Sequence, residues 1–307
     1  MNGRARRQGA LGAAPWCLLV LVGSSGCVQP RSGARGDDVT QPLRALTMDL
    51  GADDGAEVAL PNAWNHPLSP RREAAIATIL EADPDLLGVQ GALRNQIESL
   101  EDGLGPRYRS VGVGATDGAD AGEINAIFWR NDVFERFADG HFWLSDEPDV
   151  PGSTVPGASA PRLATWVELE ERASGRLLLV LNTRWDEASQ DAREQAAGLI
   201  VQTLDLIGPA PLGRVVLGGL AGTEDNVAVL TLRNGARLTD AYREAHPDRR
   251  PDEGTSDGFG GETAGERVDH VLVSAGRFTI EGAEILGGPG EGGPPSAHFP
   301  VLARLRW

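Results

Sequence analysis

Eight short apolar segments, distributed over most of the chain, constrain its fold more than any other feature. They are rich in leucine and in β-branched and aromatic residues, which favour β-strands. Several are apolar at successive positions, as expected for strands that are covered on both faces. The eight segments span residues 43–50, 85–90, 123–130, 164–171, 176–184, 214–220, 267–274 and 299–307.

Helical patterns separate several of these segments. Apolar residues recur at helical spacing in 69–82, 190–208 and 224–235, and the last two patterns end at a glycine. With 307 residues, 41% of them apolar, the chain can bury the core of one domain of ordinary size. The pattern predicts an α/β fold class in which two packed mixed sheets are flanked by helices.

The first 26 residues differ from this domain. Three arginines precede a short apolar core and a run of small residues that ends at Cys27, a layout that predicts a secretory signal peptide over 1–26. The ending GSSGC resembles a bacterial lipobox, so we expect Cys27 to carry a lipid. Ser24 departs from the leucine usual at its position, and simple cleavage is the alternative.

Residues 27–42 are polar and rich in glycine and proline, which predicts a flexible tether ahead of a domain over 43–307. We therefore expect an exported, membrane-anchored bacterial lipoprotein, or otherwise a periplasmic or secreted protein. Cys17 lies within the signal peptide, so the mature chain keeps at most one cysteine and no internal disulfide.

The charge of the chain bears on its partners. All 28 basic residues are arginine, against 44 acidic residues, for a net charge of −16. Without residues 1–26, which hold three arginines and no acidic residue, 25 basic residues remain and the charge is −19. Such a surface lacks the positive patches that bind phosphate backbones, so we expect no nucleic-acid partner.

The framework segments together resemble one family over about 265 residues. PNAWNHPLSPRRE, ADPDLLGVQ, GEINAIFWR, LNTRWD, RVDHVLVS and SAHFPVLARL follow one another as in the endonuclease/exonuclease/phosphatase superfamily. The resemblance implies the DNase-I-like fold, a four-layer α/β/β/α sandwich of metal-dependent phosphoesterases.

The resemblance also implies what the catalytic positions should hold, and six of them differ here. The family has a metal-binding Asn and Glu, a phosphate-contacting His, the Asp and Asn of its GDFN motif, and a last metal-side Asp. In the same order, this chain has Asp49, Gly91, Arg184, Gly219, Ala221 and Ala297. Five of these changes remove groups that act on the phosphate, the metal or the attacking water.

Some family residues remain. Asp269 and His298 match a hydrogen-bonded pair, and the alternative for them is a satisfied core histidine. Glu123 matches the acid that partners the lost His, so Glu123 and Arg184 are expected to form a partly buried ion pair, which stabilises the fold in the simplest interpretation. Arg184, Asn182 and Glu123 are the candidate substrate-binding residues. The adjacent Asp186 and Glu187 are expected to be solvated loop charges.

Three functions follow. The first is an exported, lipid-anchored pseudoenzyme that needs no cofactor and binds a small ligand or an envelope protein. The second is a weakly active phosphodiesterase or phosphatase that acts on a small or lipid phosphoester, with Mg²⁺ or Mn²⁺ held by Asp49, Asp269 and His298. Two carboxylates without the missing Glu make a poor Mg²⁺ site. The third is an envelope protein in which the fold is only a spacer.

Overall fold

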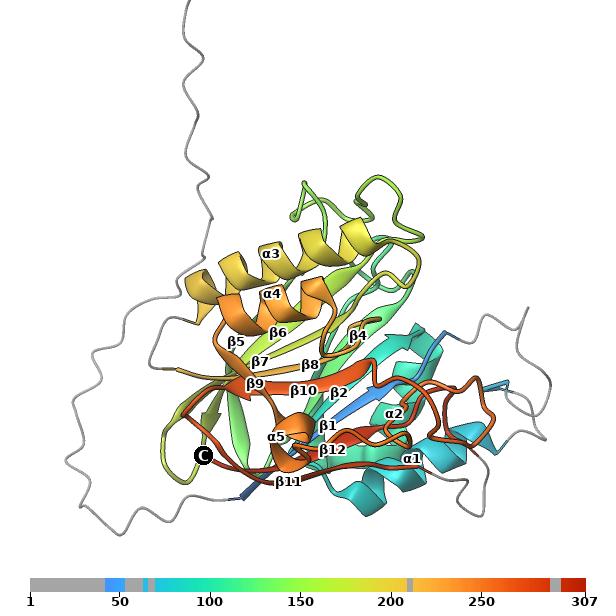
Figure 1. Cartoon of the computed structure of the whole chain (residues 1–307). Coiled ribbons are helices and arrows are strands. Elements are labelled where there is room, and N and C mark those ends of the chain that lie inside the picture. Colours follow the sequence, from blue (N-terminus) through green and yellow to red (C-terminus); the bar gives the residue numbers. More distant parts are fainter. Residues whose placement is uncertain (1–41, 53–62, 66–69, 209–211, 288–293) are drawn as a thin grey trace, which may run out of the picture. The chain divides into compact units, whose positions relative to one another are not determined.

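Two six-stranded sheets form the centre of the domain (Figure 1). The computed structural model describes residues 42–52, 63–65, 70–208, 212–287 and 294–307. The first sheet has the order β11-β12-β1-β2-β4-β3 and the second the order β5-β6-β7-β8-β10-β9. The strands are β1 (Pro42–Asp49), β2 (Leu86–Ala92), β3 (Tyr108–Val111), β4 (Ile124–Arg130), β5 (Phe134–Trp143), β6 (Leu163–Glu171), β7 (Leu177–Arg184), β8 (Gly213–Gly219), β9 (Leu238–Asp240), β10 (Asp269–Ser274), β11 (Thr279–Ile285) and β12 (Val301–Arg306).

Helices cover the outer face of each sheet. The helices are α1 (Arg71–Ala82), α2 (Arg94–Leu104), the 3₁₀ turn η2 (Gly105–Arg107), α3 (Gln190–Ile207), α4 (Val227–Gly235) and α5 (Ala241–Ala245). Figure 1 shows α1 and α2 against the first sheet and α3 and α4 against the second. One apolar cluster lies between the sheets, and two more join each sheet to its helices. The predicted four-layer α/β/β/α sandwich is confirmed.

The strand directions bring distant parts of the sequence to one end of the sandwich. In each sheet one central pair is parallel, β1 with β2 and β7 with β8, while the other pairs are antiparallel. Arg184 at the end of β7 pairs with Gly219 at the end of β8, and Gly219 pairs with Asp269 at the start of β10. The ends of these strands are therefore the place where a site can form.

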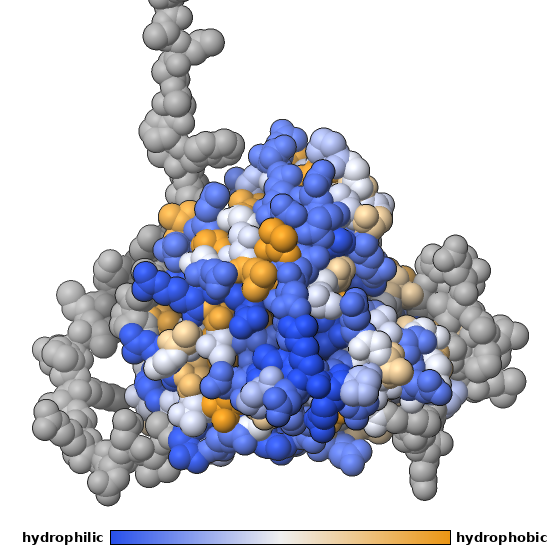
Figure 2. Space-filling view, in the orientation of Figure 1, coloured by the Kyte–Doolittle hydropathy of each residue, from blue (hydrophilic) through white to orange (hydrophobic). Residues whose placement is uncertain are grey.

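The surface of the described residues is mainly hydrophilic, as the face in Figure 2 shows. The large apolar side chains that remain exposed are few and spread over several elements: Leu80, Phe137, Val150, Leu206, Val227 and Leu230. Scattered residues of this kind are normal on soluble surfaces. Among the described helices, none has the length and apolar character that crossing a membrane requires. Residues 1–41, which carry the predicted signal peptide, Cys27 and most of the tether, lie outside the described residues.

Candidate functional site

A cleft of about 220 Å³ opens where β1, β7 and β8 end. Five of the candidate site positions line it, Asp49, Arg184, Gly219, Ala221 and His298, together with the loop residue Glu187. They come from the ends of three strands and from the segment that leads into β12. The fold thus gathers the positions of the family's catalytic centre, although most of them carry other side chains.

Arg184 holds the cleft together through three carboxylates. Its Nε atom donates to Asp49 Oδ2 at 2.8 Å, and its Nη1 atom donates to both carboxylate oxygens of Glu123 at 3.0 Å. Its Nη2 atom donates to Glu187 Oε1 at 2.5 Å. Burial acts to lower the pKa of Arg184, but the three negative charges outweigh this and raise that pKa above its ordinary value. The expected ion pair between Arg184 and Glu123 is confirmed.

The guanidinium of Arg184 lies against Gly91, where the family has its metal-binding Glu. A Cβ atom added to Gly91 would lie 3.2 Å from Arg184 Nη1 and 3.3 Å from Arg184 Cδ. Gly91 also has a φ of +66°, a conformation that is strained for any residue with a side chain. Position 91 therefore suits a glycine as long as Arg184 is present. The positive charge in this part of the cleft comes from the Arg184 guanidinium.

Gly219 and Ala221 form the floor of the cleft after β8. A Cβ atom at Gly219 would lie 2.8 Å from Asp49 Oδ2 and 3.2 Å from Asp269 Oδ1. An acidic side chain here would face two carboxylates. Ala221 has a φ of +47°, in the left-handed region that favours Gly, Asn or Asp. The backbone at this position thus keeps the conformation that suits the family's Asn, while the side chain is lost.

His298 and Asp269 form the remaining pair. The Nδ1 atom of His298 lies 2.8 Å from Asp269 Oδ2, and Asp269 is 1% exposed. Burial acts to lower the pKa of His298, but the charges of Asp269 and Asp49 outweigh it and raise that pKa to about 9. The imidazole therefore carries a proton at neutral pH. The neighbouring Ala297 brings only its backbone, whose carbonyl accepts from the Asp257 amide at 3.0 Å.

Asn182 lies away from the cleft. It is fully buried, and its Nδ2 atom donates to the carbonyls of Val89 at 2.9 Å and Ala126 at 2.8 Å, in the other sheet. Its Oδ1 atom accepts from Gln90 Nε2 at 2.6 Å. Asn182 joins the two sheets and presents no surface to a substrate, which corrects the expectation that it binds one.

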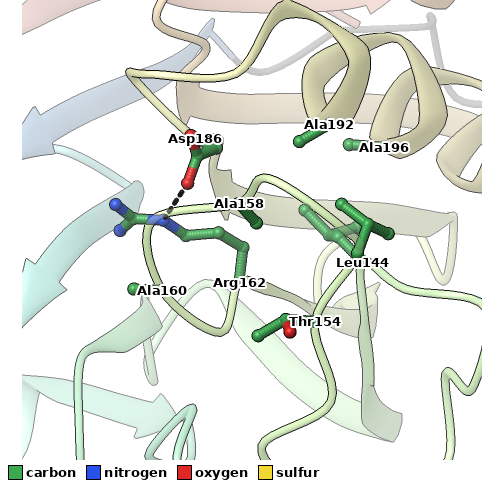
Figure 3. A pocket seen from close by; sticks show the side chains of 9 residues that line it. Leu144, Thr154, Ala158, Ala160, Arg162, Asp186, Ala192 and Ala196 are labelled. Atoms are coloured by element: carbon green, nitrogen blue, oxygen red, sulfur yellow. Dashed lines mark ion pairs between the residues drawn. The ribbon is translucent and has the colours of Figure 1, made fainter.

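The structure corrects the prediction for Asp186 and adds Arg162 to the surroundings of the cleft. Asp186 was expected to be solvated but is buried, where it accepts hydrogen bonds from the amides of Ser159 and Ser189. Arg162, which the sequence analysis missed, pairs with Glu123 and lies 4.0 Å from Asp186, beside a cavity of about 10 Å³ that holds at most one water (Figure 3). Its position just before β6, the neighbour of β7, is the signal that could have indicated it.

These residues do not fit the divalent cation of the family. Asp49, Asp269 and His298 place one ligand atom each within 4.8 Å of one another, but Asp49 Oδ2 already accepts from Arg184 and Asp269 Oδ2 already binds His298 Nδ1. An ion about 2.1 Å from Asp49 Oδ2 lies within about 4.9 Å of Arg184 Nε. At that distance two unit charges repel by about 3 kcal/mol in a medium of dielectric 20, and a divalent ion is repelled twice as strongly.

Solved structures of other proteins share this fold. The chain is 28% identical to an endonuclease/exonuclease/phosphatase from Bacteroides vulgatus, with a TM-score of 0.76 over 87% of this chain and 99% of that one. It is 26% identical to a mannosyl-6-phosphatase from Bacteroides thetaiotaomicron, with a TM-score of 0.77 over 86% of this chain and 100% of that one. The human Nocturnin catalytic domain is 16% identical over 86% of this chain and 94% of its own, with a TM-score of 0.66.

No protein-family model and no curated protein matches the sequence. The sandwich and the placement of the cleft at its strand ends define the class of DNase-I-like proteins. The chain belongs to the endonuclease/exonuclease/phosphatase superfamily.

Proposed function

We propose that this protein is an exported, lipid-anchored pseudoenzyme of the superfamily, whose cleft binds a ligand without hydrolysing it. The observation that carries the proposal is the position of Arg184. Its guanidinium lies against Gly91 and is held by Asp49, Glu123 and Glu187, so a permanent protein cation lies where the family's metal-binding Glu would reach.

The arginine cannot take over the work of a metal ion. Phosphoryl transfer needs a cation that polarises the phosphate and an activated water in line with the leaving oxygen. The guanidinium of Arg184 is already neutralised by three carboxylates, and Gly219 offers no group to orient the water. Removal of one electrostatic stabiliser costs a factor of about 100 to 1,000 in rate. Such losses are not additive, but several of them together leave little of the mechanism.

The test is calorimetric titration of the mature protein with Mn²⁺, beside hydrolysis assays with bis-p-nitrophenyl phosphate and mannose 6-phosphate. The second substrate is chosen because one similar protein is a mannosyl-6-phosphatase. We expect neither binding of Mn²⁺ nor turnover. Turnover that requires Mn²⁺ and is lost in His298→Ala would overturn the proposal.

A weakly active phosphoesterase is the second candidate. One observation favours it, the grouping of Asp49, Asp269 and His298 within 4.8 Å. It differs from the first in a single result, because a hydrolase of this kind must bind the metal before it turns over. Restoring His at position 184 in Arg184→His removes the internal cation and would raise the activity of such an enzyme.

The proposed export and anchoring rest on residues 1–27. Cys27 follows the predicted signal peptide and the small residues of the lipobox-like ending. In a bacterial host, the full chain should partition with the membrane and incorporate labelled palmitate. Cys27→Ala should abolish the label and leave the precursor uncleaved. An unlabelled protein that is processed normally would contradict lipidation and support simple secretion.

A further inference from the structure

One carboxylate oxygen beside the cleft has no hydrogen-bond partner in the described part of the chain. Asp269 is 1% exposed, and its Oδ2 atom binds His298, whereas its Oδ1 atom has no hydrogen bond among the described residues. A buried carboxylate oxygen without a donor is costly, and native structures rarely leave one unmatched.

The unpartnered oxygen faces a space above Gly219. A Cβ atom built on Gly219 would lie 3.2 Å from Asp269 Oδ1 and 2.8 Å from Asp49 Oδ2. Both carboxylate oxygens therefore border the same small volume, and Gly219 opens it to the cleft. A side chain at this position would fill the volume, so the absence of one creates the space.

The charges around this space favour a cation. Asp49, Glu123, Glu187 and Asp269 supply four negative charges, while Arg184, Arg162 and the protonated His298 supply three positive ones. The surplus is negative even with His298 charged. An anion such as phosphate is therefore repelled, and a positively charged group is attracted.

The same geometry selects among cations. The space offers two carboxylate oxygens, Asp49 Oδ2 and Asp269 Oδ1, and the first already accepts from Arg184, so it provides fewer ligands than Mg²⁺ or Mn²⁺ takes. Both oxygens accept charge-assisted hydrogen bonds well, and such bonds need no complete shell of ligands. The chain contains no lysine, so none of its own side chains can supply an ammonium group.

We propose that the space above Gly219 binds a primary ammonium group, which donates hydrogen bonds to Asp269 Oδ1 and Asp49 Oδ2. This inference rests on the proposed binding role of the cleft and names the chemistry of its ligand. The cleft volume of about 220 Å³ is below the range of about 300–1,000 Å³ that drug-sized ligands occupy. The ligand is thus a small amine or the end of a lysine side chain.

Calorimetry with the mature protein at constant ionic strength tests the proposal. The probes are ethylammonium and Nα-acetyl-lysine amide, and tetramethylammonium serves as a cation of the same charge that has no N–H donor. We expect saturable binding of at least one primary amine and at least tenfold weaker binding of tetramethylammonium. Binding of ethylammonium alone indicates a free amine, and stronger binding of the lysine derivative indicates a lysine side chain.

Two variants locate the site. Gly219→Ala places a methyl group between the two oxygens, and Asp269→Asn removes the unpartnered acceptor's charge; each should weaken amine binding at least tenfold. Asp102→Asn, which removes an exposed charge on α2, is the matched control and should bind as the parent protein does. Circular dichroism establishes that the variants fold, and either folded variant suffices for the test.

Two results overturn the inference: no saturable binding of either amine, or binding that both folded cleft variants leave unchanged. The experiments distinguish a failure of the ammonium site from a failure of the proposed pseudoenzyme function. Phosphoester turnover contradicts the pseudoenzyme whatever the amines do, whereas absent amine binding with absent turnover contradicts only the ammonium site.

Discussion

The cleft and a second polar cluster, centred on Arg267, are built from the same parts and do different things. Each has an arginine held by carboxylates beside an Asp–His pair. Arg267 donates to Glu224 at 2.5 Å and to Asp240 at 2.9 Å, and its Nη1 atom lies 2.9 Å from His270 Nδ1. His270 Nδ1 also lies 3.1 Å from Asp240 Oδ2, and its Nε2 atom donates to the Gly222 carbonyl at 2.9 Å.

The two clusters differ in the groups that their buried carboxylates bind. In the Arg267 cluster, Asp240 also accepts the amides of Tyr242 and Arg243 and so begins α5. Burial acts to raise the pKa of Asp240, but His270 and Arg267 hold it below its ordinary value. In the cleft, the buried atom left without a hydrogen bond is an acceptor, Asp269 Oδ1, whereas in the Arg267 cluster it is a donor, Arg267 Nε. The two networks therefore differ in the kind of group that remains open, and only the cleft leaves an open carboxylate oxygen.

The largest expected effect is on stability, from Arg267→Met. This change leaves Asp240 and Glu224 buried without their shared cation, which costs about 3–5 kcal/mol of the free energy of unfolding. Urea denaturation measures it. The control is Arg172→Met, which breaks an exposed pair with Glu135 and should cost less than about 1 kcal/mol. Equal losses of stability in Arg267→Met and Arg172→Met would show that the buried network contributes no more to the fold than an exposed ion pair does.

The next effect is a pH dependence of the free energy of unfolding, which arises from His298 in the cleft. The pKa of His298 is about 9 in the folded state and about 6.5 when unfolded, so its proton stabilises the fold fully below pH 6.5. This stability is lost as the pH rises through 9, by about 2 kcal/mol between pH 7 and 10. Denaturation at several pH values should show the loss in the parent protein and a flatter profile in His298→Gln. Parallel profiles would show that His298 is not charged.

Arg184→Met should cost less than Arg267→Met, because water can enter the cleft and solvate the released carboxylates. We expect about 1–2 kcal/mol of the free energy of unfolding, together with new Mn²⁺ binding that the parent protein lacks. Denaturation and calorimetry measure the two effects. A loss as large as that of Arg267→Met, without metal binding, would mean that Arg184 is a framework residue like Arg267.

The sequence predicted the interior of both sheets and missed their edges. The eight predicted segments correspond to β1, β2, β4, β6, β7, β8, β10 and β12, and the four missed strands, β3, β5, β9 and β11, are the edge strands of the two sheets. Apolar runs identify strands that are covered on both faces. β5 reads FERFADGHFW and is exposed at half of its positions, so its pattern resembles a loop. The helices α2 and α5 were missed as well.

The site was predicted in part for a related reason. Strand ends and motif order indicated the positions of Asp49, Gly219 and Asp269, because these follow from the fold. The sequence could not show that Arg184 lies against Gly91, or that Asn182 faces the other sheet, because both depend on side-chain direction across the sandwich. Arg162 was missed because the resemblance gave a catalytic role to Arg184 and Glu123 but none to Arg162, so only the structure shows its pair with Glu123.

The smallest expected effect comes from Ala221→Gly, which should raise the free energy of unfolding, whereas the preceding changes lower it. Ala221 has a φ of +47°, where an alanine is strained by about 1 kcal/mol and a glycine is not. Ala221→Gly relieves this strain but gives the unfolded chain more freedom, so the net gain is about 0.5 kcal/mol. Ala173→Gly, in an exposed turn that lacks a positive φ, should instead lose stability. Opposite signs in thermal denaturation would show that the cleft keeps the backbone of a catalytic loop whose side chain is gone, whereas losses in both variants would show that the backbone at Ala221 has relaxed.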